Sequence, residues 1–124
     1  MDDRRGAVRW NIILPMRYLS FAKHNEGSGR TRDLSTSGAQ VEMVERHAPG
    51  DRLEMVLDLP GAAQGICIDA DVVWQRKSEC VEEECNYMTG LVFKRIRDCH
   101  KQEILDYVID RHPEQSRARW WQGI

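Results

Sequence analysis

The stretch "GICIDADVVWQRK" (residues 65–77) alternates apolar and polar side chains over much of its length. Its apolar positions share one parity: Ile66, Ile68, Ala70 and Val72. A period of two is typical of a strand with one buried face. "DRLEMVLDLP" (51–60) shows the same pattern, and "LPGAAQG" (59–65) supplies the Pro and Gly of a tight connection. These stretches therefore predict two strands joined by a turn.

Three further runs have strand character: "WNIILPMRY" (10–18), "AQVEMVE" (39–45) and "YMTGLVFKRI" (87–96). Short strands joined by turns favour a mostly β fold, a small antiparallel barrel of about six strands. The pattern changes in "DCHKQEILDYVIDRHP" (98–113), whose apolar residues have helical spacing. This segment predicts one C-terminal helix packed on the barrel, with Asp98 as its N-cap and Pro113 as its stop. The apolar stripe is Ile104, Leu105, Val108 and Ile109.

The composition sets limits on function. A length of 124 residues fits one domain, and a net charge of −2 is unlike the basic balance of nucleic-acid-binding domains. No apolar run approaches the roughly 20 residues of a membrane span, and the N-terminus lacks the apolar stretch of a signal peptide. We therefore expect a cytoplasmic protein with no nucleic-acid partner and no membrane insertion.

The cysteines do not have the spacing of a zinc site. They lie at Cys67, Cys80, Cys85 and Cys99, without a close CxxC pair and without histidines at matching intervals. We expect reduced thiols and no metal or cofactor.

Two short motifs carry complementary chemistry. "RRGAVR" (4–9) contains RxxxR, and "DLSTSG" (33–38) has the form DxSxxG. Each alone is unspecific, since basic termini are commonly solvated and Asp, Ser and Gly are ordinary turn residues. Together, arginine forks bind guanine acceptors or phosphate, and a carboxylate accepts from the N1 and N2 donors of guanine. The set suits a guanine nucleotide, and it pairs no nucleophile with a base, so we expect no enzyme.

The order of these features resembles the PilZ domain, a bacterial receptor module for cyclic di-GMP. The matching features are Arg5 and Arg9, the "LP" of the first strand, the DxSxxG motif, the later strands and the helix, over roughly residues 4–112. The resemblance implies that Arg5 and Arg9 bind the guanines and phosphates, that Asp33 bonds a guanine edge, and that Ser35 meets a phosphate. Gly38 would keep the turn geometry and leave room for the ligand.

Three other residues are possible ligand contacts. Arg4 would be an extra contact of the basic arm. Trp74 falls where some relatives place an aromatic residue that stacks on a base, although its parity with Val72 favours a core position. Arg32 either adds charge near the phosphates or faces solvent.

The resemblance also implies a division of the chain and a signalling role. Residues 1–9 would be a flexible basic arm that ligand orders, 10–112 the barrel with its helix, and 113–124 a basic, aromatic tail that is either frayed or a docking segment. Such a receptor acts on a downstream effector protein. The alternative is a PilZ-like protein-interaction module that binds no nucleotide. A single-stranded nucleic-acid barrel is a third possibility, and the net charge speaks against it.

Overall fold

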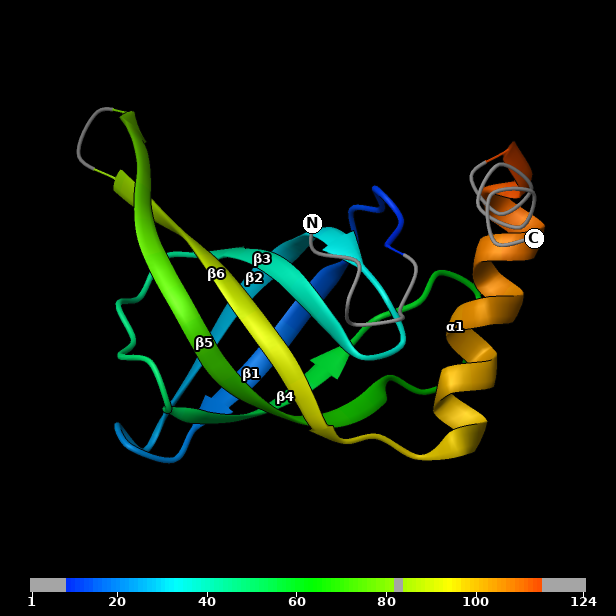
Figure 1. The fold of residues 1–124 in the computed structure, drawn as a ribbon, viewed down its shortest axis with the longest axis horizontal. Coiled ribbons are helices and arrows are strands. Elements are labelled where there is room, and N and C mark those ends of the chain that lie inside the picture. The colour runs from blue at the N-terminus through cyan, green and yellow to red at the C-terminus, as the bar shows by residue number, and fades with distance from the viewer. Residues whose placement is uncertain (1–8, 82–83, 115–124) are drawn as a thin grey trace.

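The computed structural model describes residues 9–81 and 84–114. In this part of the chain six strands form a closed antiparallel barrel in the order β1-β2-β3-β6-β5-β4, and one helix follows (Figure 1). The elements are β1 (Pro15–Ser20), β2 (Asn25–Leu34), β3 (Gly38–Met43), β4 (Arg52–Leu57), β5 (Ile66–Val81), β6 (Glu84–Arg95) and α1 (Asp98–Arg111). The mostly β fold class, the barrel and the helix are all as predicted.

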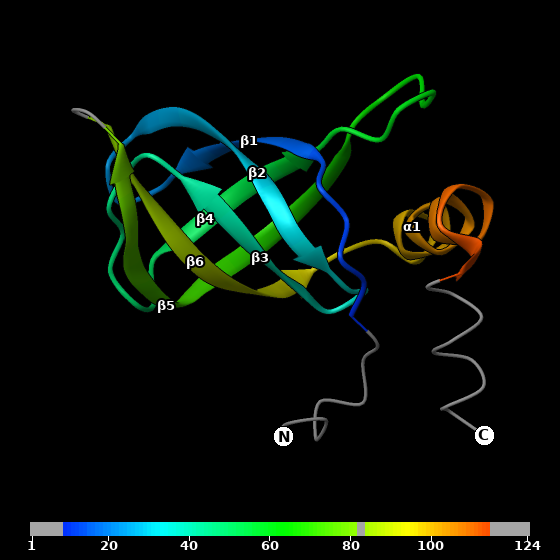
Figure 2. The ribbon, with the colours of Figure 1, turned by 90° about the horizontal axis from the view of Figure 1, so that it is seen from above.

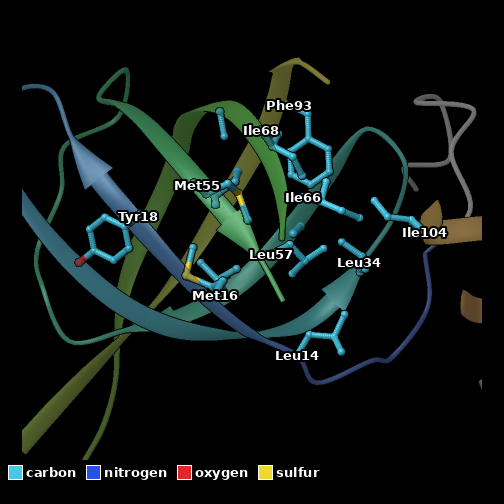
Figure 3. Close-up of a cluster of buried hydrophobic side chains, with 14 of the residues drawn as sticks. Leu14, Met16, Tyr18, Leu34, Met55, Leu57, Ile66, Ile68, Phe93 and Ile104 are labelled. Carbon is cyan, nitrogen blue, oxygen red and sulfur yellow. The ribbon is translucent and has the colours of Figure 1, made fainter. Parts of the chain in front are cut away.

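The barrel interior is filled by the residues that the alternation selects. Tyr18 on β1 lies opposite Met55 on β4 where these two strands close the barrel, and both side chains are buried. The large side chains that are almost fully buried include Ile12, Leu14, Met16, Leu34, Met43, Leu53, Met55, Leu57, Ile66, Ile68 and Ile104. Several of them converge in one cluster, as Figure 3 shows. Burial of these apolar surfaces is the main stabilising contribution to the fold.

The first apolar run enters the barrel before it becomes a strand. Residues 10–14 keep the in–out alternation, but β1 begins only at Pro15. Thr31 on β2 holds this segment through its buried hydroxyl, which accepts from the Leu14 N–H (2.8 Å) and donates to the Ile12 carbonyl (2.6 Å). The segment is therefore fixed beside β2 without a complete strand ladder.

Helix α1 packs at one end of the barrel (Figures 1 and 2), with Ile104 and Val108 buried. Asp98 is not the N-cap, because Arg97 holds the extended cap conformation (φ −71°, ψ 146°) and Asp98 already lies in the first turn. The negative charge of Asp98 in the first turn interacts favourably with the positive end of the helix dipole. Ile109 is 55% exposed, so the apolar stripe is narrower than predicted. No helix in the described part of the chain has the length and apolar character to cross a membrane.

Candidate functional site

The chain entering the barrel brings the basic segment to the polar turn. Trp10 and Leu34 exchange two backbone hydrogen bonds, of 2.8 and 2.9 Å, in an isolated β-bridge. The residues next to Trp10 are therefore close to the residues next to Leu34. Arg9 Nη1 lies 3.8 Å from Asp33 Oδ2, with the side chains 35% and 18% exposed. The structure thus places one motif arginine beside the motif aspartate.

A bulge in β2 sets the direction of Asp33. Thr31 pairs with Val41 and Asp33 with Gln40, so Arg32 is the extra residue on β2. The bulge interrupts the alternation of inward and outward side chains along β2. Thr31 is buried, whereas Arg32 and Asp33 both lie outside the core. Asp33 Oδ1 then accepts from the Gln40 N–H at 3.1 Å. The carboxylate is fixed on the outer wall at the end of the strand.

The turn between β2 and β3 is organised by Ser35, which is 2% exposed. Its hydroxyl accepts from the N–H groups of Ser37 (3.1 Å) and Gly38 (3.0 Å) and donates to the Gly38 carbonyl (3.1 Å). A Cβ on Gly38 would lie 2.5 Å from the Leu91 carbonyl oxygen, so glycine allows β3 to approach β6. In this structure Ser35 and Gly38 shape the turn, and their predicted roles toward a ligand stay predictions.

A second bulge places Trp74 outside the core. Val72 pairs with Leu91 and Trp74 with Gly90, so Val73 is the extra residue. Val72 is buried, Trp74 is only partly buried, and Gln75 takes the inward direction, donating to the buried Thr89 at 2.9 Å. The parity argument for a core tryptophan was therefore wrong, because it assumed an unbroken strand.

Arg9, Gly38 and Trp74 line one pocket on the outer wall of the barrel, with a volume of about 410 Å³. Asp33 does not line the pocket but contacts two residues that do, Arg9 and Gln40. The complete lining is Arg9, Ser37, Gly38, Ala39, Gln40, Val73, Trp74, Gly90, Leu91 and Val92. A cation and an indole thus line one hollow, and a carboxylate lies 3.8 Å from that cation.

Not every predicted residue belongs to this group. Arg32 does not line the pocket. Its side chain lies along the barrel wall, where Nη1 is 3.1 Å from Glu42 Oε1. Glu42 also pairs with Arg30 at 3.5 Å. Arg4 and Arg5, most of the predicted 1–9 arm, and residues 115–124 of the predicted tail lie outside the described residues.

Sequence reasoning missed seven lining residues: Ser37, Ala39, Gln40, Val73, Gly90, Leu91 and Val92. Ser37 and Gln40 flank Gly38 in the motif and its strand, so proximity to DxSxxG was an available signal. Val73 and Gly90 had no such signal, because they join the site only through the β5 bulge and its register with β6.

The barrel end near Tyr18 carries a separate polar cluster, away from Ile104 at the helix end (Figure 3). Tyr18 donates to Glu45 Oε1 at 2.5 Å, and burial together with this bond raises the pKa of Tyr18. The same bond lowers the pKa of Glu45. Burial lowers the pKa of His47, with Lys23 acting in the same direction. This cluster fits a structural role, since its groups bond mainly with one another.

Solved structures share this fold. The PilZ domain of YcgR from Escherichia coli, solved with c-di-GMP, superposes with a TM-score of 0.67 at 14% identity, covering 94% of this chain and 96% of that one. The MrkH–c-di-GMP complex of K. pneumonia superposes with a TM-score of 0.71 at 18% identity, covering 93% of this chain and 55% of that one. The Bacillus subtilis inhibitor of motility MotI/DgrA superposes with a TM-score of 0.68 at 23% identity, covering 90% of this chain and 52% of that one. The chain thus spans about half the length of MotI and MrkH. Comparison with curated proteins finds no significant match.

Fold and site together define a small β-barrel domain with a pocket on its outer wall. The chain belongs to the PilZ domain family, whose model matches residues 3–110.

Proposed function

We propose that this PilZ domain is a non-enzymatic receptor for cyclic di-GMP, which binds in the outer-wall pocket. The observation that carries the proposal is that Arg9 and Trp74 line one hollow of about 410 Å³ and that Asp33 lies 3.8 Å from Arg9. The family membership and the neighbours solved with c-di-GMP, YcgR and MrkH, support the choice of ligand.

The pocket's groups match the parts of a guanine dinucleotide. The Arg9 guanidinium can bond a phosphate or the O6 and N7 acceptors of guanine. Asp33 Oδ2 can accept from the N1 and N2 donors of the base. Trp74 offers an aromatic surface on which a purine can stack. Each group supplies an interaction that the others do not.

Ser35 takes a supporting role in this proposal. Its hydroxyl makes four hydrogen bonds inside the turn, one of them to the Ser37 hydroxyl at 3.3 Å, so it fixes the backbone that presents Ser37 and Gly38. Ser37 lines the pocket and has a hydroxyl of its own, which makes it the better candidate for a phosphate contact.

Arg5, with Arg4 as an extra contact, would complete the site from the arm of residues 1–9. Ligand binding would order this arm over the pocket, and a downstream effector would recognise the ordered form. Ordering costs conformational entropy, so we expect a dissociation constant of about 1 μM.

Calorimetric titration with cyclic di-GMP tests the site. Arg5→Ala, Arg9→Ala and Asp33→Ala should each weaken binding by about 10- to 100-fold, the range for lost hydrogen bonds to charged groups. Arg17→Ala is the matched control, because Arg17 is exposed, pairs with Asp58 at 3.2 Å and does not line the pocket. Wild-type affinity in Arg9→Ala and Asp33→Ala would show that the site is assigned wrongly.

A melting curve separates the receptor from an interaction module that binds no nucleotide. A ligand that binds only the folded chain raises its melting temperature, by an amount that grows with the excess of ligand over Kd. We expect a rise with cyclic di-GMP that becomes smaller at high salt, since the ligand is a dianion. The absence of any rise at a large excess would favour the interaction module.

A further inference from the structure

The first turn of α1 groups three unlike metal-binding side chains. The ligand atoms of Cys99, His100 and Glu103 all lie within 4.8 Å of one another. His100 Nε2 is 3.9 Å from Glu103 Oε1. On a helix, side chains three and four residues apart are neighbours, so Glu103 faces both of the others. The cluster is built by local helix geometry.

Within the described residues, the three groups make no strong interaction that would compete with a metal. Cys99 is an exposed free thiol, and His100 directs Nε2 toward Glu103 while its buried Nδ1 has no hydrogen-bond partner in this part of the chain. The 3.9 Å approach of Glu103 to His100 is too long for a hydrogen bond. The ring, the thiol and the carboxylate can therefore all turn toward a common point.

Closing the cluster around an ion needs only side-chain movement. With metal–ligand bonds of about 2.0–2.3 Å, the ligand atoms of a tetrahedral zinc site lie about 3.5 Å apart. Cys99 and Glu103 are exposed, so their side chains can change rotamer and move by roughly 1 Å.

We propose that Cys99, His100 and Glu103, the Cys-His-Glu cluster, bind one Zn²⁺ with water as the fourth ligand. Sulfur, imidazole nitrogen and carboxylate oxygen are the ligand types that zinc takes, and three protein ligands with one water is a known zinc arrangement. Binding forms the Zn–S bond and releases the thiol proton of Cys99 to solvent. This site does not depend on nucleotide binding. The sequence did not indicate it, because Cys99 has no close cysteine partner and its neighbourhood with Glu103 depends on helix geometry.

Titration of the reduced full chain with Zn²⁺, followed by calorimetry, tests the proposal. We expect one Zn²⁺ per chain and a loss of this binding in Cys99→Ser, His100→Gln and Glu103→Gln. Cys67→Ser is the matched control, since Cys67 is also an exposed free thiol but lies on β5. Titration with Co²⁺ should give a thiolate-to-metal absorption band that Cys99→Ser abolishes and Cys67→Ser retains.

Two further measurements keep the test decisive. Equal melting temperatures of the metal-free variants and wild type would show that the substitutions leave the fold intact. Sedimentation should give the same species with and without zinc. Undiminished Zn²⁺ binding in Cys99→Ser would overturn the proposal, and so would one Zn²⁺ shared between two chains.

Discussion

The indole of Trp74 rests directly on the β6 backbone at Gly90: a Cβ there would lie 2.3 Å from Nε1 and 2.4 Å from Cε2 of the ring. Gly90→Ala should therefore push the indole out of its position without separating the strands, because the obstructing atoms belong to a partly exposed side chain. If Trp74 stacks on a guanine, cyclic di-GMP affinity should fall by about tenfold or more in calorimetry.

Gly38→Ala should behave differently, although it also adds one methyl group beside the pocket. Its Cβ would lie 2.5 Å from a backbone oxygen, that of Leu91, so β3 and β6 would have to move apart. We expect a loss of about 1–3 kcal/mol in the free energy of unfolding, measured by urea denaturation. A variant as stable as wild type would show that this strand pair tolerates the shift.

Ser35→Ala should affect stability more than ligand chemistry. The substitution leaves the N–H groups of Ser37 and Gly38 without their shared acceptor in a partly buried turn. We expect a loss of about 1–3 kcal/mol in unfolding free energy. If Ser35→Ala instead keeps full stability and loses affinity, the hydroxyl contacts the ligand directly and its role in the turn is minor.

Asp33→Asn separates the two functions of the carboxylate. The amide oxygen can still accept from the Gln40 N–H, so the strand end should keep its geometry. The charge beside Arg9 is lost, and the amide nitrogen presents donors toward the donors of guanine. We expect nearly unchanged melting and about 10- to 100-fold weaker binding. Unchanged affinity would exclude Asp33 as the group that binds the guanine edge.

The barrel and its core could be predicted because alternation is a property of individual strands. Trp10, Ile12, Leu14, Met16 and Tyr18 are all buried, as their shared parity predicted. This holds although the first three precede β1, since the alternation continues through the extended segment.

The wall of the pocket could be predicted only in part. Arg9 and Asp33 were found from their motifs, but the direction of Trp74 depends on an extra residue at Val73. A bulge is a property of two paired strands, so the sequence of one strand does not reveal it. Parity is reliable until the first bulge, and Trp74 lies just beyond one.

His47 should make the fold sensitive to mild acid. Burial, with Lys23 nearby, lowers its folded-state pKa, whereas the unfolded chain titrates near pH 6.5. The unfolded chain therefore binds more protons as the pH falls below about 6.5, and stability decreases there. Glu45, whose pKa is lowered by the Tyr18 bond, adds a further loss of stability below about pH 4.5.

Urea denaturation from pH 7.5 to 5.5 should show a smaller decline in the free energy of unfolding for His47→Gln than for wild type. His24→Asn, in the exposed turn before β2, is the matched control, and an equal reduction in both variants would contradict the assignment to His47.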